Sequence, residues 1–347
     1  MNKIRVLIID DSMLIRKILT EILNSSPDIE VVGAAEDPLI AREMIKQLNP
    51  DVLTLDIEMP KMDGITFLRN LMRLRPTPVV MISTLTEKGA GITLEALTLG
   101  AVDFIAKPKV DVVSTLNSYA DEIISKVKMA ARANLSNSNR ALKTREPDKI
   151  IEPANKRPGS DKTIIALGAS TGGTEAIKVV VRGLPANTPG IVITQHLPAA
   201  FSESFVKHID LASKMTALIP KHGQAVESGH IYLAPGDRHM EVVKEGSRYV
   251  IKLLDTEPVN RHKPAVDVMF RSVAQCAGSN AIAVLLTGMG ADGAAGMKEM
   301  HDAGAKTVIQ DEPTSVVWGM PGSAYKLGCV DYMLPLEEVA HKIVSLV

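Results

Sequence analysis

The chain alternates short, β-rich apolar runs with stretches of helical periodicity, and this pattern limits its fold most narrowly. In the first third, helical patterns such as residues 12–25, with Ser12 placed as an N-cap, fill the gaps between the runs. Strand and helix in alternation produce βαβ units, which form a parallel sheet covered by helices. The pattern predicts a doubly wound α/β domain whose five parallel strands lie near residues 4–10, 29–35, 51–57, 78–84 and 101–107.

A second alternating series follows a polar, proline-bearing segment that lacks apolar periodicity. With 347 residues, of which 46% are apolar, the chain can bury two separate cores. We expect one domain at residues 1–134, a linker at 135–160 and a larger domain at 161–347. The larger domain should be a second doubly wound α/β unit, with a mostly parallel sheet and an antiparallel excursion near residues 230–255. Catalytic groups in such sheets gather beyond the carboxyl ends of the strands.

Five polar side chains fall at the ends of four predicted strands in the first domain. Asp10 and Asp11 end the first strand, and Asp56 ends the third. Neighbouring carboxylates repel one another unless a divalent cation compensates them, and hard oxygen ligands with open positions suit Mg²⁺ and a phosphate. An aspartate beside such a metal can accept a phosphoryl group. Ser83 and Lys107, which end the fourth and fifth strands, add a hydroxyl and an ammonium for phosphate oxygens.

Residues 1 to about 125 resemble, through these side chains, a response-regulator receiver domain, which has a flavodoxin-like fold. The resemblance implies that a histidine kinase phosphorylates Asp56. It also implies a Mg²⁺ site formed by Asp10, Asp11, Asp56 and the carbonyl of Glu58. The conformational-switch positions of the family correspond to Ser83 and Lys107. A receiver-shaped domain that had lost phosphorylation would lack one of the expected side chains, and none is missing.

Ser170 lies in Gly168-Ala-Ser-Thr-Gly172, a G-x-S-x-G sequence at the point where an apolar run ends and a helical pattern begins. In that arrangement the serine occupies a sharp strand-to-helix turn, and the N–H groups that follow, including that of Thr171, point toward a developing oxyanion. The alternative is a helix N-cap, because serine is a preferred residue at that position. A nucleophilic serine also needs a base within reach, and a cap does not.

Of the eight histidines, His196 alone directly ends a strong β-like run, on the strand expected beside that of Ser170. A Ser–His pair also needs a carboxylate that orients the imidazole and holds its tautomer. Two strand-end aspartates compete for this role, Asp292 in a glycine-rich loop and Asp311 after the next strand. The glycines imply a tight loop close to other backbone, so we favour Asp292 and keep Asp311 as the alternative.

The loop around Asp292 also reads Gly-Met-Gly-Ala-Asp-Gly, a G-x-G-x-x-G sequence after a predicted strand. Asp311 follows about twenty residues later, a spacing typical of a dinucleotide-binding βα turn. Such a motif usually opens its domain and needs several βα units after it, whereas only about fifty residues remain here. We therefore rank nucleotide binding well below ester hydrolysis.

The order Ser170, His196, Asp292 differs from the Ser, Asp, His order of α/β-hydrolases. It is similar to that of the chemotaxis protein-glutamate methylesterases (CheB), whose motifs appear here as GASTGGTEA, ITQHLP, LAPGDRHM, PVNRHKPAVDVMF, LTGMGADGAAGM and GMPGSA. This resemblance spans nearly the whole chain. It implies hydrolysis of γ-glutamyl methyl esters on chemoreceptors, with release of methanol, and deamidation of selected receptor glutamines. It also implies that Met289 contributes an oxyanion N–H and that the unphosphorylated receiver inhibits the hydrolase, which itself needs no metal.

The near-neutral charge of the chain does not favour binding to nucleic acid or to an anionic membrane surface. Because 39 basic and 40 acidic residues give a net charge of -1, we expect no nucleic-acid partner and no membrane insertion. The first apolar run is too short for a signal peptide, so we expect a cytoplasmic protein with Cys276 and Cys329 as core thiols. Residues 260–264 are rich in hydrogen-bond donors and are either a contact for an acidic receptor segment or a solvated loop.

Overall fold

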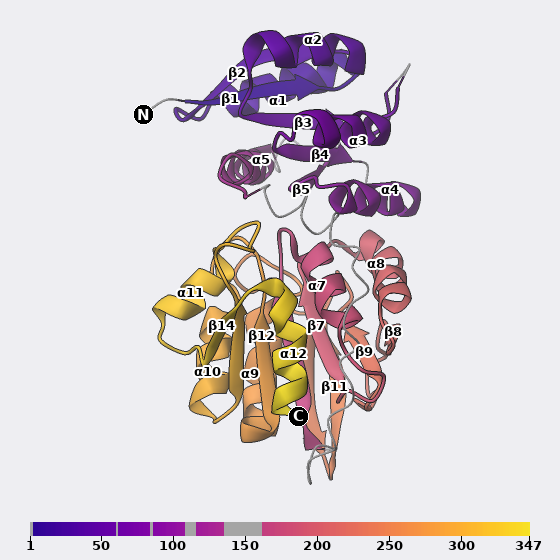
Figure 1. Cartoon of the computed structure of the whole chain (residues 1–347), viewed down its shortest axis with the longest axis vertical. Coiled ribbons are helices and arrows are strands. Elements are labelled where there is room, and N and C mark those ends of the chain that lie inside the picture. Colours follow the sequence, from indigo (N-terminus) through magenta and orange to yellow (C-terminus); the bar gives the residue numbers. More distant parts are fainter. Residues whose placement is uncertain (1–2, 60–61, 84–85, 108–115, 135–161) are drawn as a thin grey trace. The chain divides into compact units, whose positions relative to one another are not determined.

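The chain forms two compact units, residues 1–141 and 142–347, in a computed structural model (Figure 1). The residues that the structure describes are 3–59, 62–83, 86–107, 116–134 and 162–347. The linker predicted at 135–160 lies outside them. Within these ranges, no helix combines the length and the apolar character needed to cross a membrane.

The first unit is a parallel sheet of five strands in the order β2-β1-β3-β4-β5, as the alternating pattern predicts. The strands are Ile4–Ile9 (β1), Ile29–Ala35 (β2), Val52–Asp56 (β3), Val79–Ser83 (β4) and Asp103–Ala106 (β5). The helices are Met13–Asn24 (α1), Pro38–Leu48 (α2), Gly64–Leu74 (α3), Glu87–Thr98 (α4) and Leu116–Ala130 (α5). Ser12 caps α1 as predicted, since its side chain accepts a hydrogen bond from the N–H of Ile15.

The second unit contains a seven-stranded sheet in the order β14-β13-β12-β6-β7-β9-β8, in which all neighbouring strands are parallel. Its strands are Ile164–Ala169 (β6), Ile191–Gln195 (β7), Thr216–Leu218 (β8), His230–Leu233 (β9), Ala281–Leu285 (β12), Lys306–Gln310 (β13) and Tyr332–Leu334 (β14). The helices are Gly173–Arg182 (α7), Ala199–Ala212 (α8), Val266–Ala277 (α9), Ala294–Asp302 (α10), Met320–Lys326 (α11) and Leu336–Leu346 (α12), and Gly278–Asn280 (η3) is a short 3₁₀ helix. Strands β6, β7 and β12 are completely buried, which explains their largely apolar sequences.

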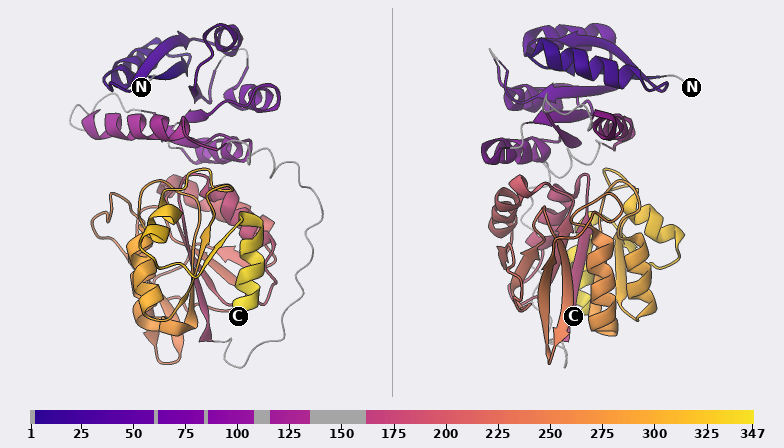
Figure 2. Two further views of the ribbon diagram at one scale, coloured as in Figure 1. Left: turned by 60° about the vertical axis from the view of Figure 1, so that its left-hand side comes forward. Right: turned by 180° about the vertical axis from the view of Figure 1, so that it is seen from behind.

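The antiparallel excursion predicted near residues 230–255 is real but begins later than expected. Strand β9 belongs to the parallel sheet, and the antiparallel pair consists of His239–Glu245 (β10) and Arg248–Leu254 (β11), which form a separate two-stranded ribbon. This ribbon lies alongside the main sheet in Figure 2. Its buried side packs against α9, where the hydroxyl of Ser272 accepts a hydrogen bond from the N–H of Val242.

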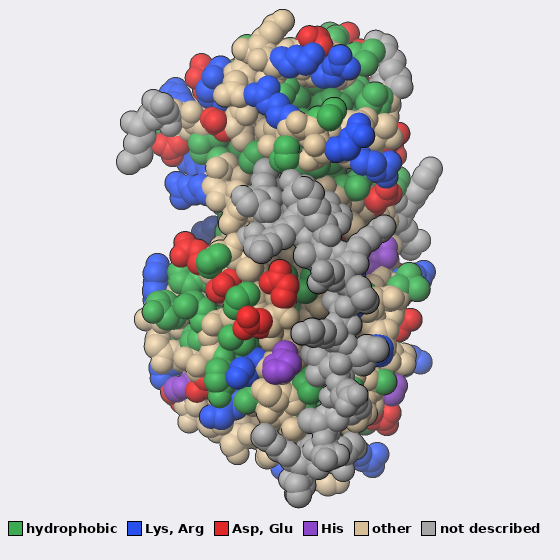
Figure 3. All heavy atoms as spheres, in the orientation of Figure 1, with side chains coloured by type: hydrophobic (Ala, Val, Ile, Leu, Met, Phe, Trp, Pro, Cys, Tyr) green, Lys and Arg blue, Asp and Glu red, His purple; other side chains and the backbone are tan. Residues whose placement is uncertain are grey.

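Charged side chains of both signs appear on the visible face of each unit in Figure 3, in keeping with a net charge of -1. The two cysteines form no disulfide. Cys329 is fully buried in the core of the second unit, and Cys276 is half-buried against the same core. Both therefore pack as small apolar side chains, as the sequence predicted.

Candidate active site and phosphoacceptor site

Three adjacent strands of the second sheet, β12, β6 and β7, end at one edge, and one predicted site residue follows each of them. Ser170 directly follows β6, His196 directly follows β7, and Asp292 lies in the loop after β12. The strand order thus brings together residues that are up to 122 positions apart in the sequence (292 minus 170). This is the edge where α/β sheets place their catalytic groups.

Ser170 stands on a sharp turn between β6 and α7. Its N–H donates to the carbonyl of Thr287, and its own carbonyl accepts from the N–H of Gly173, which closes the turn. Gly172 has a φ of +76°, a conformation that glycine adopts without steric penalty. A Cβ on Gly172 would also lie 2.7 Å from the side chain of Val316. The turn therefore requires glycine after Thr171 and presents the serine at the sheet edge.

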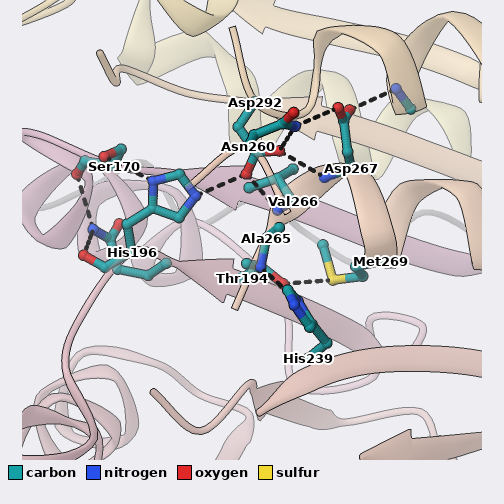
Figure 4. A network of polar contacts seen from close by, with 12 residues as sticks. Ser170, Thr194, His196, His239, Asn260, Ala265, Val266, Asp267, Met269 and Asp292 are labelled. Carbon is teal, nitrogen blue, oxygen red and sulfur yellow. Dashed lines mark hydrogen bonds and ion pairs between the residues drawn. The ribbon is translucent and has the colours of Figure 1, made fainter. Parts of the chain in front are cut away.

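His196 links the other two residues, as Figure 4 shows. Its Nδ1 lies 3.1 Å from the Oγ of Ser170, and its Nε2 lies 2.8 Å from Oδ2 of Asp292. The Asp292 side chain is 2% exposed and the His196 side chain 8%, so water screens this pair weakly. The buried side chain of Gln195 fixes the strand ends, because its Nε2 donates to the carbonyl of Ser170 over 2.9 Å.

Asp292 is held as a carboxylate by four donors. Oδ2 accepts from the imidazole of His196 and, over 2.6 Å, from the N–H of Val266, while Oδ1 accepts from the side chain of Asn260 and the N–H of Asp267. The two N–H groups belong to the first turn of α9, whose positive end favours an anion. Burial raises the pKa of Asp292. The hydrogen bond and positive charge of His196, together with the hydrogen bonds from Asn260 and the N–H of Val266, outweigh burial and lower the pKa to about 2.

The carboxylate determines which nitrogen of His196 carries the proton. Asp292 can only accept, so Nε2 must be protonated, and in the neutral imidazole Nδ1 is then the unprotonated nitrogen that faces the Ser170 hydroxyl. This arrangement allows Nδ1 to take the hydroxyl proton. The ring is turned relative to the chymotrypsin triad, in which Nε2 faces the serine and Nδ1 the aspartate, but the chemical roles are the same.

Asp311, the alternative third residue, is occupied elsewhere. Its Oδ1 accepts from the N–H and the hydroxyl of Thr314, so its carboxylate stabilises its own turn after β13. Asp292 of the G-x-G-x-x-G sequence is likewise fully engaged by His196 and α9. The geometry therefore favours Asp292 as the partner of His196 and gives no support to nucleotide binding at this loop.

The two predicted oxyanion donors come from loops that lie against each other. Thr171 follows the serine, and its carbonyl accepts from the hydroxyl of Thr287 over 3.0 Å. Met289 follows Gly288, whose carbonyl accepts from the N–H groups of Gly319 and Met320. Their assignment as oxyanion donors remains a prediction.

Gly288 makes the close approach between these loops possible. A Cβ at this position would lie 2.8 Å from Cβ of Ser170 and 2.2 Å from the sulfur of Met320. Gly288→Ala must therefore push the serine turn away from the 287–293 loop. We expect the rate of ester hydrolysis to fall about tenfold to a hundredfold, because small misplacements of reacting groups are costly. Methanol release and the midpoint of thermal unfolding test this.

Gly91→Ala provides the matched control, since Gly91 lies in α4 of the other unit and a Cβ there has nothing within 4 Å. This variant should keep the wild-type hydrolysis rate. Equal rates for Gly288→Ala and the wild type would show that the loop spacing does not matter.

Two contacts of the site escaped the sequence interpretation. Asn260 binds Asp292, and the ring of His262 stacks on that of His196 with centroids 3.7 Å apart and planes inclined by 13°. Both residues belong to the donor-rich segment 260–264, for which the sequence alone allows either receptor contact or a solvated loop. Richness in donors was the available signal, but nothing local connects this segment with a strand end 64 positions earlier (260 minus 196).

The first unit gathers its predicted acidic residues at the carboxyl edge of its own sheet. Oxygens of Asp10, Asp11 and Asp56 lie within 4.8 Å of one another, and the ammonium of Lys107 lies 2.7 Å from Oδ2 of Asp56 and 3.5 Å from Oδ2 of Asp10. Burial raises the pKa of Asp56 to about 6; the charge of Asp10 adds to this, and Lys107 opposes it. Three carboxylates this close repel one another, and an all-oxygen donor set of this kind fits a divalent cation.

The remaining predicted residues surround this cluster. The N–H of Glu58 donates to the Asp56 carboxylate. Ser83 is buried at the end of β4, with its hydroxyl 2.7 Å from that of Thr93 on α4. The structure therefore connects the predicted switch hydroxyl to a helix, a contact that the sequence did not suggest.

The chain matches two protein families in the same order as the two units. A response regulator receiver domain matches residues 6–117, and the CheB methylesterase family matches residues 165–343. The solved catalytic domain of the CheB methylesterase from Thermotoga maritima superposes with a TM-score of 0.52 at 35% identity, covering 53% of this chain and 98% of that domain.

Relatives match over nearly the whole chain. A protein from Xanthomonas campestris named protein-glutamate methylesterase/protein-glutamine glutaminase 1 is 56% identical over 347 residues, which cover 99% of this chain and 97% of that protein. A relative from Hydrogenovibrio crunogenus with the name protein-glutamate methylesterase/protein-glutamine glutaminase is 54% identical, and the match covers 100% of both chains. The chain belongs to the CheB methylesterase family and carries the response regulator receiver domain at its N-terminal end.

Proposed function

We propose that this protein is a phosphorylation-regulated serine hydrolase that removes methyl groups from glutamate γ-methyl esters of chemoreceptors, with release of methanol, and deamidates selected receptor glutamines. The observation that carries the proposal is the continuous contact from the Ser170 hydroxyl through His196 to the buried Asp292 carboxylate. Esters and primary amides of the same side chain present the same carbonyl, so one nucleophile can attack both.

In the proposed reaction, Nδ1 of His196 takes the proton as the oxygen of Ser170 attacks the γ-carbonyl. Asp292 holds the ring and stabilises the imidazolium that forms. Backbone N–H groups of Thr171 and Met289 stabilise the tetrahedral oxyanion. The imidazolium then protonates the departing methanol or ammonia, and water, activated by the same nitrogen, hydrolyses the acyl-enzyme and regenerates the serine.

The receiver regulates this reaction, in our proposal, through phosphorylation of Asp56 by a chemotaxis histidine kinase. Asp10, Asp11, Asp56 and the carbonyl of Glu58 would hold Mg²⁺, which neutralises the carboxylates and the phosphoryl oxygens when bound. Lys107, already paired with Asp56, and Ser83 would contact the phosphoryl group. Both reactions would take place in the cytoplasm, where the receptor and kinase domains meet the protein.

The hydrolase is tested with methylated chemoreceptor in membranes as the substrate. The full-length chain should release methanol, and a serine-directed fluorophosphonate should label Ser170 and stop the release. The absence of methanol release, with receptor of confirmed methylation, would contradict the proposed substrate.

Regulation is tested with Asp56→Asn. The full-length wild type, incubated with acetyl phosphate and Mg²⁺, should gain a phosphoryl group, detectable by intact mass, and should hydrolyse the ester faster. Asp56→Asn lacks the carboxylate that accepts the phosphoryl group, so neither change should occur, and EDTA should prevent both in the wild type. Asp51→Asn is the control, because Asp51 is exposed and its carboxylate accepts from the N–H of Arg5, away from the acidic cluster. Phosphorylation of Asp56→Asn would show that another residue is the acceptor.

A further inference from the structure

The segment that contacts both His196 and Asp292 is a tight turn over residues 259–262. Val259 and His262 exchange two backbone hydrogen bonds of 3.0 and 2.9 Å, which pairs them as the two ends of the turn. The two central residues, Asn260 and Arg261, have φ values of 54° and 68°. Two successive non-glycine residues in the left-handed region are unusual and require support from their surroundings. The contacts of the Asn260 and His262 side chains show what this conformation achieves.

One side chain of the turn covers the face of the imidazole proposed as the base. The rings of His262 and His196 lie nearly parallel, 13° apart, with centroids separated by 3.7 Å. A His196 ring that is bound by hydrogen bonds only at its two nitrogens can still tilt about the line that joins them. A flat ring stacked on its face opposes this tilt and keeps water from that side.

The other side chain of the turn separates two buried carboxylates. The Nδ2 amide group of Asn260 donates 2.8 Å hydrogen bonds to both Oδ1 of Asp292 and Oδ2 of Asp267. Their side chains are 2% and 4% exposed, so their mutual repulsion is weakly screened. Oδ1 of Asp267 also accepts from the N–H of Gly296 in the first turn of α10. Asn260 thus ties Asp292 to a carboxylate that is itself fixed on a helix.

We propose that Asn260 and His262 are positioning residues of the hydrolase: the amide of Asn260 sets the orientation of the Asp292 carboxylate, and the ring of His262 sets the plane of His196. This inference rests on the proposed function of the triad. Neither residue needs to touch the reacting atoms. The left-handed turn is what allows two side chains separated by one residue to reach the imidazole of His196 and its carboxylate partner Asp292.

His262→Ala should lower kcat for methanol release about tenfold and leave KM nearly unchanged, because the ring acts on His196 and not on substrate binding. His262→Phe keeps a flat ring and should recover most of kcat. His341→Ala, on the exposed face of α12, is the control and should match the wild type. A kcat for His262→Ala within twofold of the wild type, or failure of His262→Phe to rescue, would overturn the role of this ring.

Asn260→Gly removes the amide while glycine keeps the left-handed backbone, so the turn itself should remain. We expect kcat to fall about tenfold to a hundredfold with little change in KM. Asn49→Gly is the matched control, since Asn49 is also an exposed asparagine with positive φ, at 46°, but ends α2 in the other unit. Wild-type kcat in Asn260→Gly would overturn the role of the amide.

The rate of Ser170 labelling by a fluorophosphonate separates this inference from the proposed substrate. Slower labelling of His262→Ala and Asn260→Gly, with unchanged unfolding midpoints, supports positioning even if the wild type releases no methanol from receptor. Methanol release by the wild type together with unchanged labelling and kcat in both variants would overturn the inference and leave the proposed function intact.

Discussion

Replacing Ser170 by alanine should lower methanol release from methylated receptor by about ten-thousand-fold or more, to the level supported by binding and oxyanion contacts alone. The reason is that the oxygen removed is the one that lies 3.1 Å from Nδ1 of His196 and forms the acyl-enzyme. A helix cap in the same place would behave differently, because loss of a capping hydroxyl costs about 1 kcal/mol of stability and leaves catalysis intact.

The measurement is methanol release together with the unfolding midpoint of each variant. Ser345→Ala, in which an exposed serine near the end of α12 is replaced, is the control and should keep full activity. Combining Ser170→Ala with His196→Ala should add little further loss, since residues that act as one unit are not additive. Activity of Ser170→Ala within tenfold of the wild type would rule out the nucleophile.

Asp292→Asn should cost about a thousandfold to ten-thousandfold in kcat, although the two side chains have the same shape. The carboxylate accepts four hydrogen bonds from His196, Val266, Asp267 and Asn260 and has no proton to donate. An amide has one oxygen and one NH₂ group. If the NH₂ group faces Nε2 of His196, the ring carries its proton on Nδ1 and cannot accept from Ser170.

If the NH₂ group instead faces away from His196, it meets the donors of Asn260 and of the Asp267 N–H, and a buried donor then opposes another donor. The first arrangement gives His196 the wrong tautomer, and the second opposes buried donors to one another. In both, the carboxylate that orients the ring is lost. Asp311→Asn is the control that the chain itself offers, because Asp311 also follows a strand but its carboxylate accepts from Thr314 in its own turn. Similar kcat losses in the two variants would contradict the assignment of Asp292.

Much of the fold was readable from local pattern. Short β-rich apolar runs predict the strands β6, β7 and β12, and these strands are completely buried. The antiparallel ribbon begins after β9, later than the sequence predicts, because the run that forms β9 looks the same whether it pairs with β7 in a parallel sheet or with a hairpin partner. Strand partners depend on the whole sheet, which a local window does not contain.

The sequence by itself determined which residues stand at strand ends: Ser170 after β6, His196 after β7 and Asp56 at the end of β3. Local periodicity shows where a strand ends, and the type of residue at that end shows whether it can act as a nucleophile, a base or a phosphoryl acceptor. Only the tertiary structure places Asp292, rather than Asp311, 2.8 Å from Nε2 of His196. It also brings Asn260 to Asp292 and His262 to the imidazole. Those outcomes depend on sheet order and on a left-handed turn whose geometry is supported by distant partners, so no neighbouring residues encode them.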